Sequence, residues 1–319
     1  MPCNEKYAIL LLTHKNVNQV NRLINKISHP NVDIFIHCDK RWDIDYNDIK
    51  KPKGQNIYFS DERVCSDLDT WDLVKATMLM IQKSRHLNPD GYKYYILLSG
   101  QDYPVQSMEN IIQNLEEEYP KPFIDCTPWD KNNWIYSKFT NVYYYQKYSR
   151  FVNKFIARGF IRKCIKIIPY IVNKYIIAKL FDLRKKLSSL SVELYGGSAW
   201  WILPDVIIDY ILSEYEKNDN YMKVLSRTLT PEETFFQIMS MRSELSALID
   251  VNECDRITQN CKTYAWFFDE VRSFVGHPYI FTIAEKDKLK KLSETHFFAR
   301  KFDENIDSEV FDWIDENLL

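Results

Sequence analysis

The sequence predicts an α/β fold in which a mainly parallel central sheet is flanked by helices. Three observations predict it. The first 126 residues alternate apolar runs with amphipathic segments, the pattern of successive strand–helix units. The apolar runs are continuous, which indicates strands buried on both faces. The chain has 319 residues, 45% of them hydrophobic, and this is ample for a sizeable core.

Elements of the first part follow from apolar spacing. A helix after the first strand carries one apolar face, made of Val17, Val20, Leu23, Ile24 and Ile27. The expected strands are Tyr7–Thr13, Val32–His37, Ile57–Ser60, Tyr94–Ser99 and Phe123–Cys126. The other expected helices are Thr70–His86 and Ser107–Glu118.

The last part of the chain, from Ser191, contains fewer clear elements. We expect a strand at Ser198–Leu203, helices begun by Pro204 and Pro231, and a final helix at Ser308–Leu318. One domain over 1–319 results, with a nucleotide-binding half at 1–126, a helical basic insertion at 138–186 and an acceptor-binding, catalytic half at 191–319.

The insertion at 138–186 carries 13 Lys and Arg residues against one acid, Asp182, with apolar and aromatic residues between them. A basic amphipathic segment of this kind can lie on anionic lipid. The alternative is a helical subdomain that packs on the core and leaves its cations in water. RNA binding is disfavoured, because no RNA-binding motif accompanies the charge.

Composition limits the function classes. The formal net charge of −2 gives no overall case for nucleic acid. The seven cysteines show no metal-ligand spacing, and the start of the chain has no secretory signal, so we expect reduced thiols. No apolar stretch reaches the ~18 residues that a spanning helix needs. These features predict a cytoplasmic protein. The basic insertion extends this prediction to a peripheral position on the inner face of the cytoplasmic membrane.

Polar side chains follow three of the expected strands. The segments are Thr13-His14-Lys15, His37-Cys38-Asp39-Lys40 and Gly100-Gln101-Asp102. Ligands bind at the carboxyl ends of the strands in such sheets, so these ends predict a nucleotide pocket. Solvated turns are the alternative for any one of them. No GxGxxG follows the first strand, which disfavours a dinucleotide site or a P-loop.

Five segments in the order IHCDKR, LLSGQDYP, YGGSAWWILP, TPEETFFQ and HFFARKFD give the chain a specific resemblance. Together they resemble the core-2/I-branching enzyme family, which contains branching β-1,6-N-acetylglucosaminyltransferases and peptide O-xylosyltransferases. The resemblance runs from Tyr7 to Asp303 and is weakest in the basic insertion. It implies a variant GT-A fold and inverting transfer from a UDP-sugar without a divalent metal. The absence of a secretory signal points to a bacterial member.

Glu233 matches the catalytic glutamate of the family's PxE motif, so the resemblance implies that it is the base. Inverting transfer needs one carboxylate to accept the proton of the acceptor hydroxyl. Thr230-Pro231-Glu232-Glu233 also fits a capping box, in which Glu233 would only cap a helix. Glu232 is the neighbouring candidate, and we expect it to be an exposed charge.

Arg300 and Lys301 lie in the ARKF motif, to which the resemblance assigns the diphosphate. Positive charge there stabilises the leaving group. Neighbours on a regular strand point to opposite faces, so both can reach the diphosphate only if the chain bends. Lys301 is the stronger candidate of the two.

Further contacts are implied by the resemblance or by residue type. Leu12, Thr13, His14 and Asp39 are the expected nucleotide contacts. Candidate sugar or acceptor contacts are Asp102, Ser198, Trp200, Trp201 and Trp266. A turn cap is the alternative for Asp102, and core packing is the alternative for each tryptophan.

No metal or cofactor is expected. Asp43-Ile44-Asp45 and Asp67-Leu68-Asp69 have the spacing of a metal-binding Asp-x-Asp motif, although this spacing is common by chance. The expected partners are a UDP-sugar and a glycan or lipid-linked saccharide acceptor. A non-catalytic nucleotide-sugar-binding or scaffolding protein of the same fold, and a metal-dependent transferase, are the alternatives.

Overall fold

The computed structural model describes residues 5–66, 70–128, 193–217, 220–226, 228, 230–251, 264–266 and 279–319. The expected insertion at 138–186 lies outside the described residues, and so do Asp67 and Asp69. The structure therefore does not test what we expected of them.

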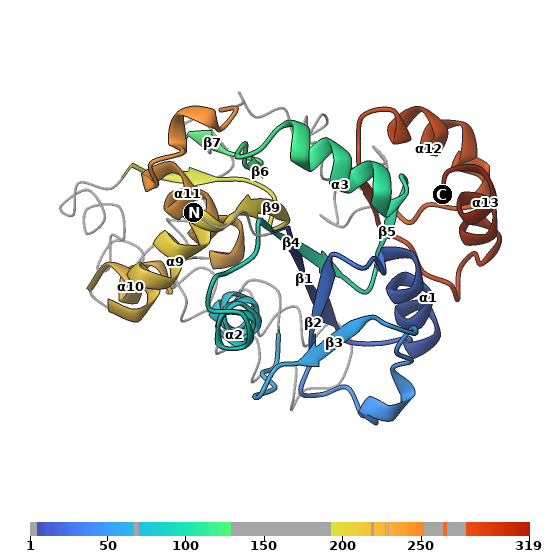
Figure 1. Cartoon of the computed structure of the whole chain (residues 1–319), viewed down its shortest axis with the longest axis horizontal. Helices are drawn as coiled ribbons and strands as arrows, with labels where there is room; N and C mark the ends of the chain where they lie inside the picture. The colour runs from blue at the N-terminus through green and yellow to red at the C-terminus, as the bar shows by residue number, and fades with distance from the viewer. Residues whose placement is uncertain are drawn as a thin grey trace, which may run out of the picture.

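A six-stranded sheet forms the centre of the molecule (Figure 1). Its strands are β1 (Tyr7–Thr13), β2 (Val32–Cys38), β3 (Asn56–Phe59), β4 (Tyr94–Ser99), β6 (Phe123–Ile124) and β9 (Trp201–Pro204). Their order is β3-β2-β1-β4-β9-β6. The first four strands are parallel, and β9 is antiparallel to both β4 and β6. The prediction of a mainly parallel sheet is confirmed.

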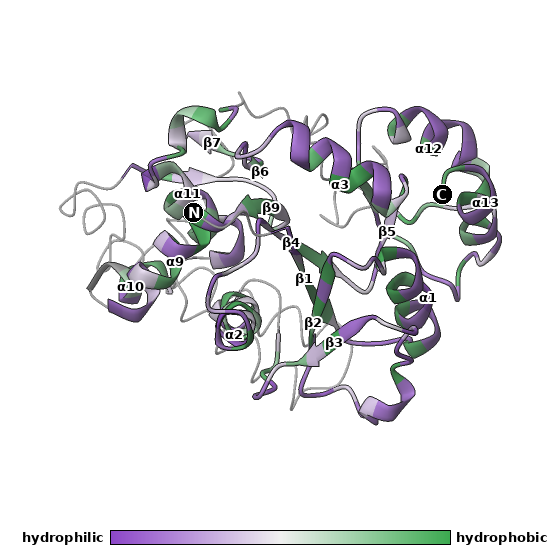
Figure 2. Ribbon diagram, viewed as in Figure 1, coloured by the Kyte–Doolittle hydropathy of each residue, from purple (hydrophilic) through white to green (hydrophobic). Residues whose placement is uncertain are grey.

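Continuous apolar sequence builds this sheet. All residues of β1, β2 and β4 are buried, as their unbroken apolar pattern predicted. Each buried Leu or Ile contributes about 1.5–3 kcal/mol to folding. Figure 2 shows the hydrophobic strands enclosed by helices with polar outer faces.

The helices cover both faces of the sheet (Figure 1). Helix α2 (Trp71–Leu87) packs on β1 and β2, and α9 (Asp205–Lys217) packs on β4 and β9. Helix α1 (Val17–Ile27) lies on the opposite side. The remaining helices are α3 (Met108–Glu117), α10 (Asn220–Leu225), α11 (Phe235–Arg242), α12 (Lys286–Ser293) and α13 (Glu309–Asn317).

Helix α13 is held to α1 by charge. Arg22 of α1 bonds Asp312 and Asp315 of α13, each at 2.7 Å, and Tyr103 donates a hydrogen bond to Asp315 at 2.7 Å. The final helix, expected at Ser308–Leu318, is confirmed within one residue at each end.

A second, small sheet was not predicted. It consists of β10 (Tyr264–Trp266), β11 (Phe298–Arg300) and β5 (Asp102–Pro104), in that order. Strand β11 is antiparallel to β5 and places Arg300 opposite Asp102. A further pair, β7 (Thr127–Pro128) with β8 (Tyr195–Gly196), precedes β9. These strands have only two or three residues each, too few for a periodic signal in the sequence.

Pro204 is the last residue of β9, and α9 begins at Asp205, one residue after the predicted start. The predicted helix start at Pro231 was wrong. Pro231–Glu233 forms a short 3-10 turn, η3, and α11 begins only at Phe235. The other 3-10 turns are η1 (Tyr46–Asp48), η4 (Ser246–Leu248) and η6 (Ile283–Glu285). Within the described residues, no helix is long and apolar enough to cross a membrane.

Candidate active site

The carboxyl ends of β1, β2 and β4 meet, as the parallel sheet requires. Backbone bonds join their loops: Gly100 N donates to Leu12 O at 2.9 Å, and Asp39 N donates to Thr13 O at 2.8 Å. Leu12 and Thr13 are buried, and their backbone carbonyls hold the loops that follow the neighbouring strands. The predicted nucleotide contacts therefore lie around one point at the edge of the sheet.

Asp39 organises the loop after β2. Its carboxylate accepts hydrogen bonds from Arg41 N at 2.8 Å, Arg41 Nε at 2.9 Å, and both the amide and hydroxyl of Ser66 at 2.9 Å. Burial alone would raise the pKa of Asp39, but these bonds outweigh burial and hold that pKa well below its usual range. Asp39 is thus a buried anion that fixes a loop.

His14 and Lys15 follow β1 and lie near the cations of β11. His14 is exposed to solvent, yet the protein around it lowers the pKa of the imidazole, and Lys15 and Lys301 lower it further. Asp39 opposes them. Lys15 makes an ion pair with Asp303 at 2.6 Å. This ion pair joins the segment that follows β1 to the segment that follows β11.

Arg300 is buried, with 7% of its surface exposed. Its Nη1 donates to Asp102 Oδ1 at 2.9 Å and to Ser99 Oγ, and its guanidinium carbon lies 4.3 Å from the centre of a Trp200 ring. The guanidinium is held between an acid and an aromatic face.

Asp102 does not fit a direct sugar contact. The residue is fully buried, its Oδ1 faces Arg300, and its Oδ2 accepts from Ser99 N at 2.5 Å. The prediction of a sugar-binding role is corrected here: pairing between β5 and β11 turns the carboxylate inward onto Arg300.

Lys301 differs from its neighbour. It is half-buried, and among the described residues its ammonium has no hydrogen-bond or ion-pair partner. Burial and the charges of Arg300 and Lys15 lower the pKa of Lys301 to about 8, against the opposing charge of the Asp102 carboxylate. Strand β11 ends at Arg300. The regular alternation that would separate the two side chains therefore stops between them.

The backbone of Lys301 is firmly held. Its N donates to Tyr279 O at 3.2 Å, and its O accepts from Phe281 N at 2.9 Å. On the other side, Gln19 donates to Gly100 O at 2.7 Å and to Phe302 O at 3.1 Å. The ammonium, which has no partner within the part of the chain that the structure describes, is thus attached to a well-held main chain.

Glu233 ends the turn η3 and is half-buried. The capping-box alternative is wrong: Thr230 has a left-handed backbone (φ 49°), and its side chain makes no capping bond. Glu232, expected to be exposed, is 4% exposed and therefore buried. The turn packs against α2 and α11, which explains why Glu232 faces inward.

One short segment, Gly197–Trp200, connects Glu233 with Arg300. Gly197 N donates to Glu233 O at 3.0 Å, and the ring of Trp200, three residues later, lies against Arg300. Three residues span at most ~11 Å. The candidate base and the buried cation thus belong to one region, although they are 67 positions apart in the chain.

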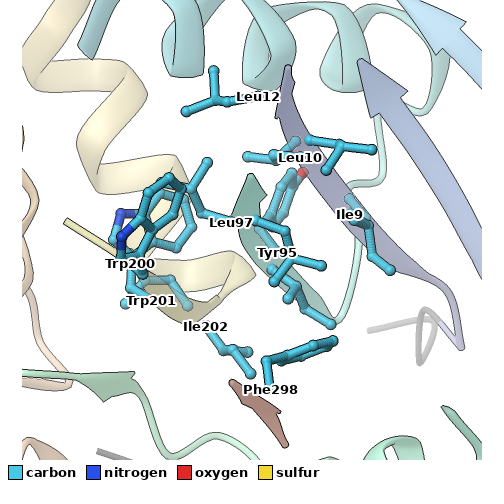
Figure 3. Close-up of a cluster of buried hydrophobic side chains, with 14 of the residues drawn as sticks. Ile9, Leu10, Leu12, Tyr95, Leu97, Trp200, Trp201, Ile202 and Phe298 are labelled. Carbon is cyan, nitrogen blue, oxygen red and sulfur yellow. The ribbon is translucent and has the colours of Figure 1, made fainter. Parts of the chain in front are cut away.

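Trp200, at the end of this segment, and Trp201, the next residue, are both buried (Figure 3). Trp201 is fully buried, and its ring lies 4.9 Å from Phe236 of α11, so the predicted sugar platform is corrected to core packing. Trp200 is 5% exposed and supports Arg300. Trp266 lies in β10, next to Arg300 in register.

Ser198 is buried and held on three sides. Its N donates to Asp125 Oδ2 at 3.1 Å, its O accepts from Gln237 Nε2 at 2.6 Å, and its Oγ accepts from Trp200 N at 3.4 Å. These contacts make Ser198 part of the framework. The predicted sugar or acceptor contact through Ser198 is not supported by this burial.

No metal cluster forms among the described side chains. Within those ranges, no group of three or more His, Cys, Asp or Glu residues could hold a metal ion. Asp45 caps the turn η1 by accepting from Asn47 N at 2.9 Å.

Sequence reasoning missed several residues that build the site. Asp125 and Gln237 hold Ser198, and Ser99 holds Arg300. A signal existed for two of them: Asp125 is a carboxylate inside an expected strand, and Gln237 interrupts the apolar run of α11. A polar residue inside an apolar element is usually hydrogen-bonded.

Comparison with known proteins gives relatives along nearly the whole chain. No family model matches. The chain is 21% identical to xylosyltransferase 2 of Canis lupus familiaris and of Homo sapiens over 324 residues, 98% of this chain and 34% of each relative. It is 24% identical to a xylosyltransferase of Ciona intestinalis over 327 residues, with the same coverage. The chain thus spans about one third of the length of these curated relatives.

Among solved structures, the apo structure of the WbbM bifunctional glycosyltransferase matches 94% of this chain and 46% of its own. The TM-score is 0.41 and the sequence identity 10%. The sequence similarity covers every element of the candidate site, from β1 to β11. The curated relatives therefore connect this chain with the glycosyltransferases.

Proposed function

We propose that this chain is an inverting glycosyltransferase of the core-2/I-branching family, with a variant GT-A fold, that uses a UDP-sugar without a divalent metal. One observation carries the proposal. The half-buried ammonium of Lys301 has no acidic partner among the described residues and stands beside Arg300 and Lys15. Such a cation is unfavourable unless an anion joins it. A diphosphate at the carboxyl edge of the sheet would supply that anion.

The residues divide the reaction between them. Glu233 accepts the proton of the acceptor hydroxyl, whose oxygen then attacks the anomeric carbon of the donor sugar. The bond between that carbon and the diphosphate oxygen breaks, and UDP leaves with the electron pair. Lys301 stabilises its charge by direct contact, and Arg300, held in a buried ion pair with Asp102, lies next to it in the chain. Attack opposite the leaving group inverts the anomeric centre.

The names of the relatives favour xylose as the transferred sugar, with N-acetylglucosamine as the second candidate. The acceptor is a hydroxyl of a glycan or of a lipid-linked saccharide. His14, which is exposed directly after β1, and the loop after β2 that Asp39 fixes would border the nucleotide.

Binding of UDP in the presence of EDTA tests the proposal. We expect Lys301→Met to weaken UDP binding about 10- to 100-fold, because a charge-assisted contact is lost. Isothermal titration calorimetry measures the affinity, and Lys53→Met, at an exposed lysine, is the control. Binding that requires added Mn²⁺ or Mg²⁺ would contradict metal independence. No binding under either condition would favour a scaffold.

The affinity for UDP should depend on pH. The pKa of Lys301 is about 8 in the free protein. A bound diphosphate favours the charged form and raises this pKa, so affinity is constant below pH 8 and falls as pH rises above it. We expect a loss of up to ~10-fold per pH unit. In Lys301→Arg the cation stays charged, so the ratio of the two affinities isolates Lys301 from the titration of UDP itself.

A ratio that does not change between pH 7 and pH 10 would show that Lys301 does not contact the diphosphate.

A further inference from the structure

Gln237 is a buried amide in the first turn of α11, four residues after Glu233. Its Nε2 donates to the carbonyl of Ser198 at 2.6 Å. Its Oε1 is buried and has no hydrogen-bond partner among the described residues. An apolar side chain would fill this place at lower cost, since a buried unpaired carbonyl costs about 1–3 kcal/mol. Packing alone does not explain a glutamine here.

The bond from Gln237 acts on a segment that has contacts at both ends. At one end Gly197 N holds Glu233 O at 3.0 Å. At the other end the Trp200 ring lies 4.3 Å from the guanidinium carbon of Arg300. Ser198 stands between them, and Gln237 is the side chain that joins α11 to it.

A second contact closes the arrangement on the opposite side. Asp125 Oδ2 accepts from Ser198 N at 3.1 Å. The peptide groups on both sides of Ser198 are therefore fixed, one by an acid from the end of β6 and one by the amide of α11. The helix that follows the candidate base is thus locked to the segment that supports the candidate cations.

We propose that Gln237 is a positioning residue that sets the distance between the base Glu233 and the leaving-group site at Arg300 and Lys301. This inference rests on the proposed function. In-line displacement needs the base and the leaving group on opposite sides of one carbon, and a displacement of 1 Å can cost about 100-fold in rate. Gln237 itself touches neither substrate.

Gln237→Met tests the proposal, because it keeps the volume and removes the bond to Ser198. We expect kcat for donor hydrolysis to fall at least about tenfold. The KM and the UDP affinity should stay within about twofold, since Lys301 is untouched. The donor is whichever of UDP-xylose and UDP-N-acetylglucosamine the native protein hydrolyses faster. Rates are taken per folded molecule, with folding checked by circular dichroism.

Ser240→Ala is the matched control. Ser240 lies three residues further along α11, is equally buried, and its hydroxyl has no partner among the described residues. Within the described ranges its hydroxyl makes no hydrogen bond to the Gly197–Trp200 segment, so kcat should stay within about twofold of native.

Gln237→Glu gives a second readout. The introduced carboxyl can donate to the Ser198 carbonyl only when it is protonated. Its kcat, divided by that of the native protein, should therefore rise as pH falls. A ratio independent of pH, or a kcat of Gln237→Met within twofold of native, would overturn the positioning role. An equal loss of kcat and UDP affinity would also overturn it, because it would indicate general disruption.

The two proposals fail differently. If native protein does not bind UDP, or if Glu233→Gln keeps full activity, the proposed function falls and the role of Gln237 falls with it. If UDP binds and Glu233→Gln is inactive while Gln237→Met is not, only the positioning role is lost.

Discussion

Glu233→Gln is expected to lower kcat for sugar transfer by about 10²- to 10⁴-fold, the usual contribution of a general base. The amide keeps the shape of the side chain but cannot accept the proton of the acceptor hydroxyl. The backbone contact of Glu233 with Gly197 uses the main-chain carbonyl and survives the substitution. Folding and UDP affinity should therefore stay close to native.

Initial rates with UDP-xylose and UDP-N-acetylglucosamine, compared with UDP affinity from calorimetry, check this prediction. Glu232→Gln is the matched control, since it changes the adjacent carboxylate of the same turn, which is buried. Full activity in Glu233→Gln together with loss in Glu232→Gln would assign the base to Glu232. Full activity in both would remove base catalysis by this turn.

Gly197→Ala is expected to be the most destabilising substitution proposed for this protein. A Cβ on Gly197 would lie 1.8 Å from the carbonyl oxygen of Asp125 and 2.7 Å from its carbonyl carbon. Both are main-chain atoms, and Asp125 is also held by its bond to Ser198 N. Neither of these two backbone segments can shift away without a large cost in free energy. We expect a loss of about 4 kcal/mol or more, and a fall in melting temperature of about 10 °C.

Thermal unfolding followed by circular dichroism measures the effect. Gly54→Ala is the control, because a Cβ there meets no atom within 4 Å although φ is +82°. This control isolates the free-energy cost of placing an alanine at a positive φ, about 1 kcal/mol. A melting temperature of Gly197→Ala no lower than that of Gly54→Ala would contradict the close approach in this structure.

The main sheet could be predicted from the sequence because its signals are local. Strands β1, β2 and β4 are apolar throughout, and α1 repeats its apolar residues at helical spacing. Ser107 caps α3 through its hydroxyl, in agreement with the predicted start of that helix. Parallel pairing then brings the ends of β1, β2 and β4 to one edge. The motifs indicated the candidate site residues, and the hydrophobic periodicity predicted that the strand ends that carry them meet at one edge of the sheet.

Burial and partners were decided by contacts between distant segments. Trp200 and Trp201 are equivalent in sequence and both are buried, but Trp201 packs on Phe236 of α11 whereas Trp200 lies against Arg300. Arg300 and Lys301 are adjacent cations, yet pairing of β11 with β5 gives Arg300 an acid and leaves Lys301 without one among the described residues. Glu232 and Glu233 also differ in burial because of tertiary packing: Glu232 is buried where the turn packs against α2 and α11, and Glu233 is half-buried.

The sequence by itself thus determined the main strands and helices, and its motifs indicated the candidate side chains, since both signals depend on neighbours a few positions away. The tertiary structure decided which charges are neutralised within the protein and which remain for a ligand. That outcome depends on whether the fold places an opposite charge within hydrogen-bond distance. Asp102 and Arg300 form such a pair, although they are 198 positions apart in the chain. No local pattern encodes such a meeting, because it is the product of the packing of the whole sheet.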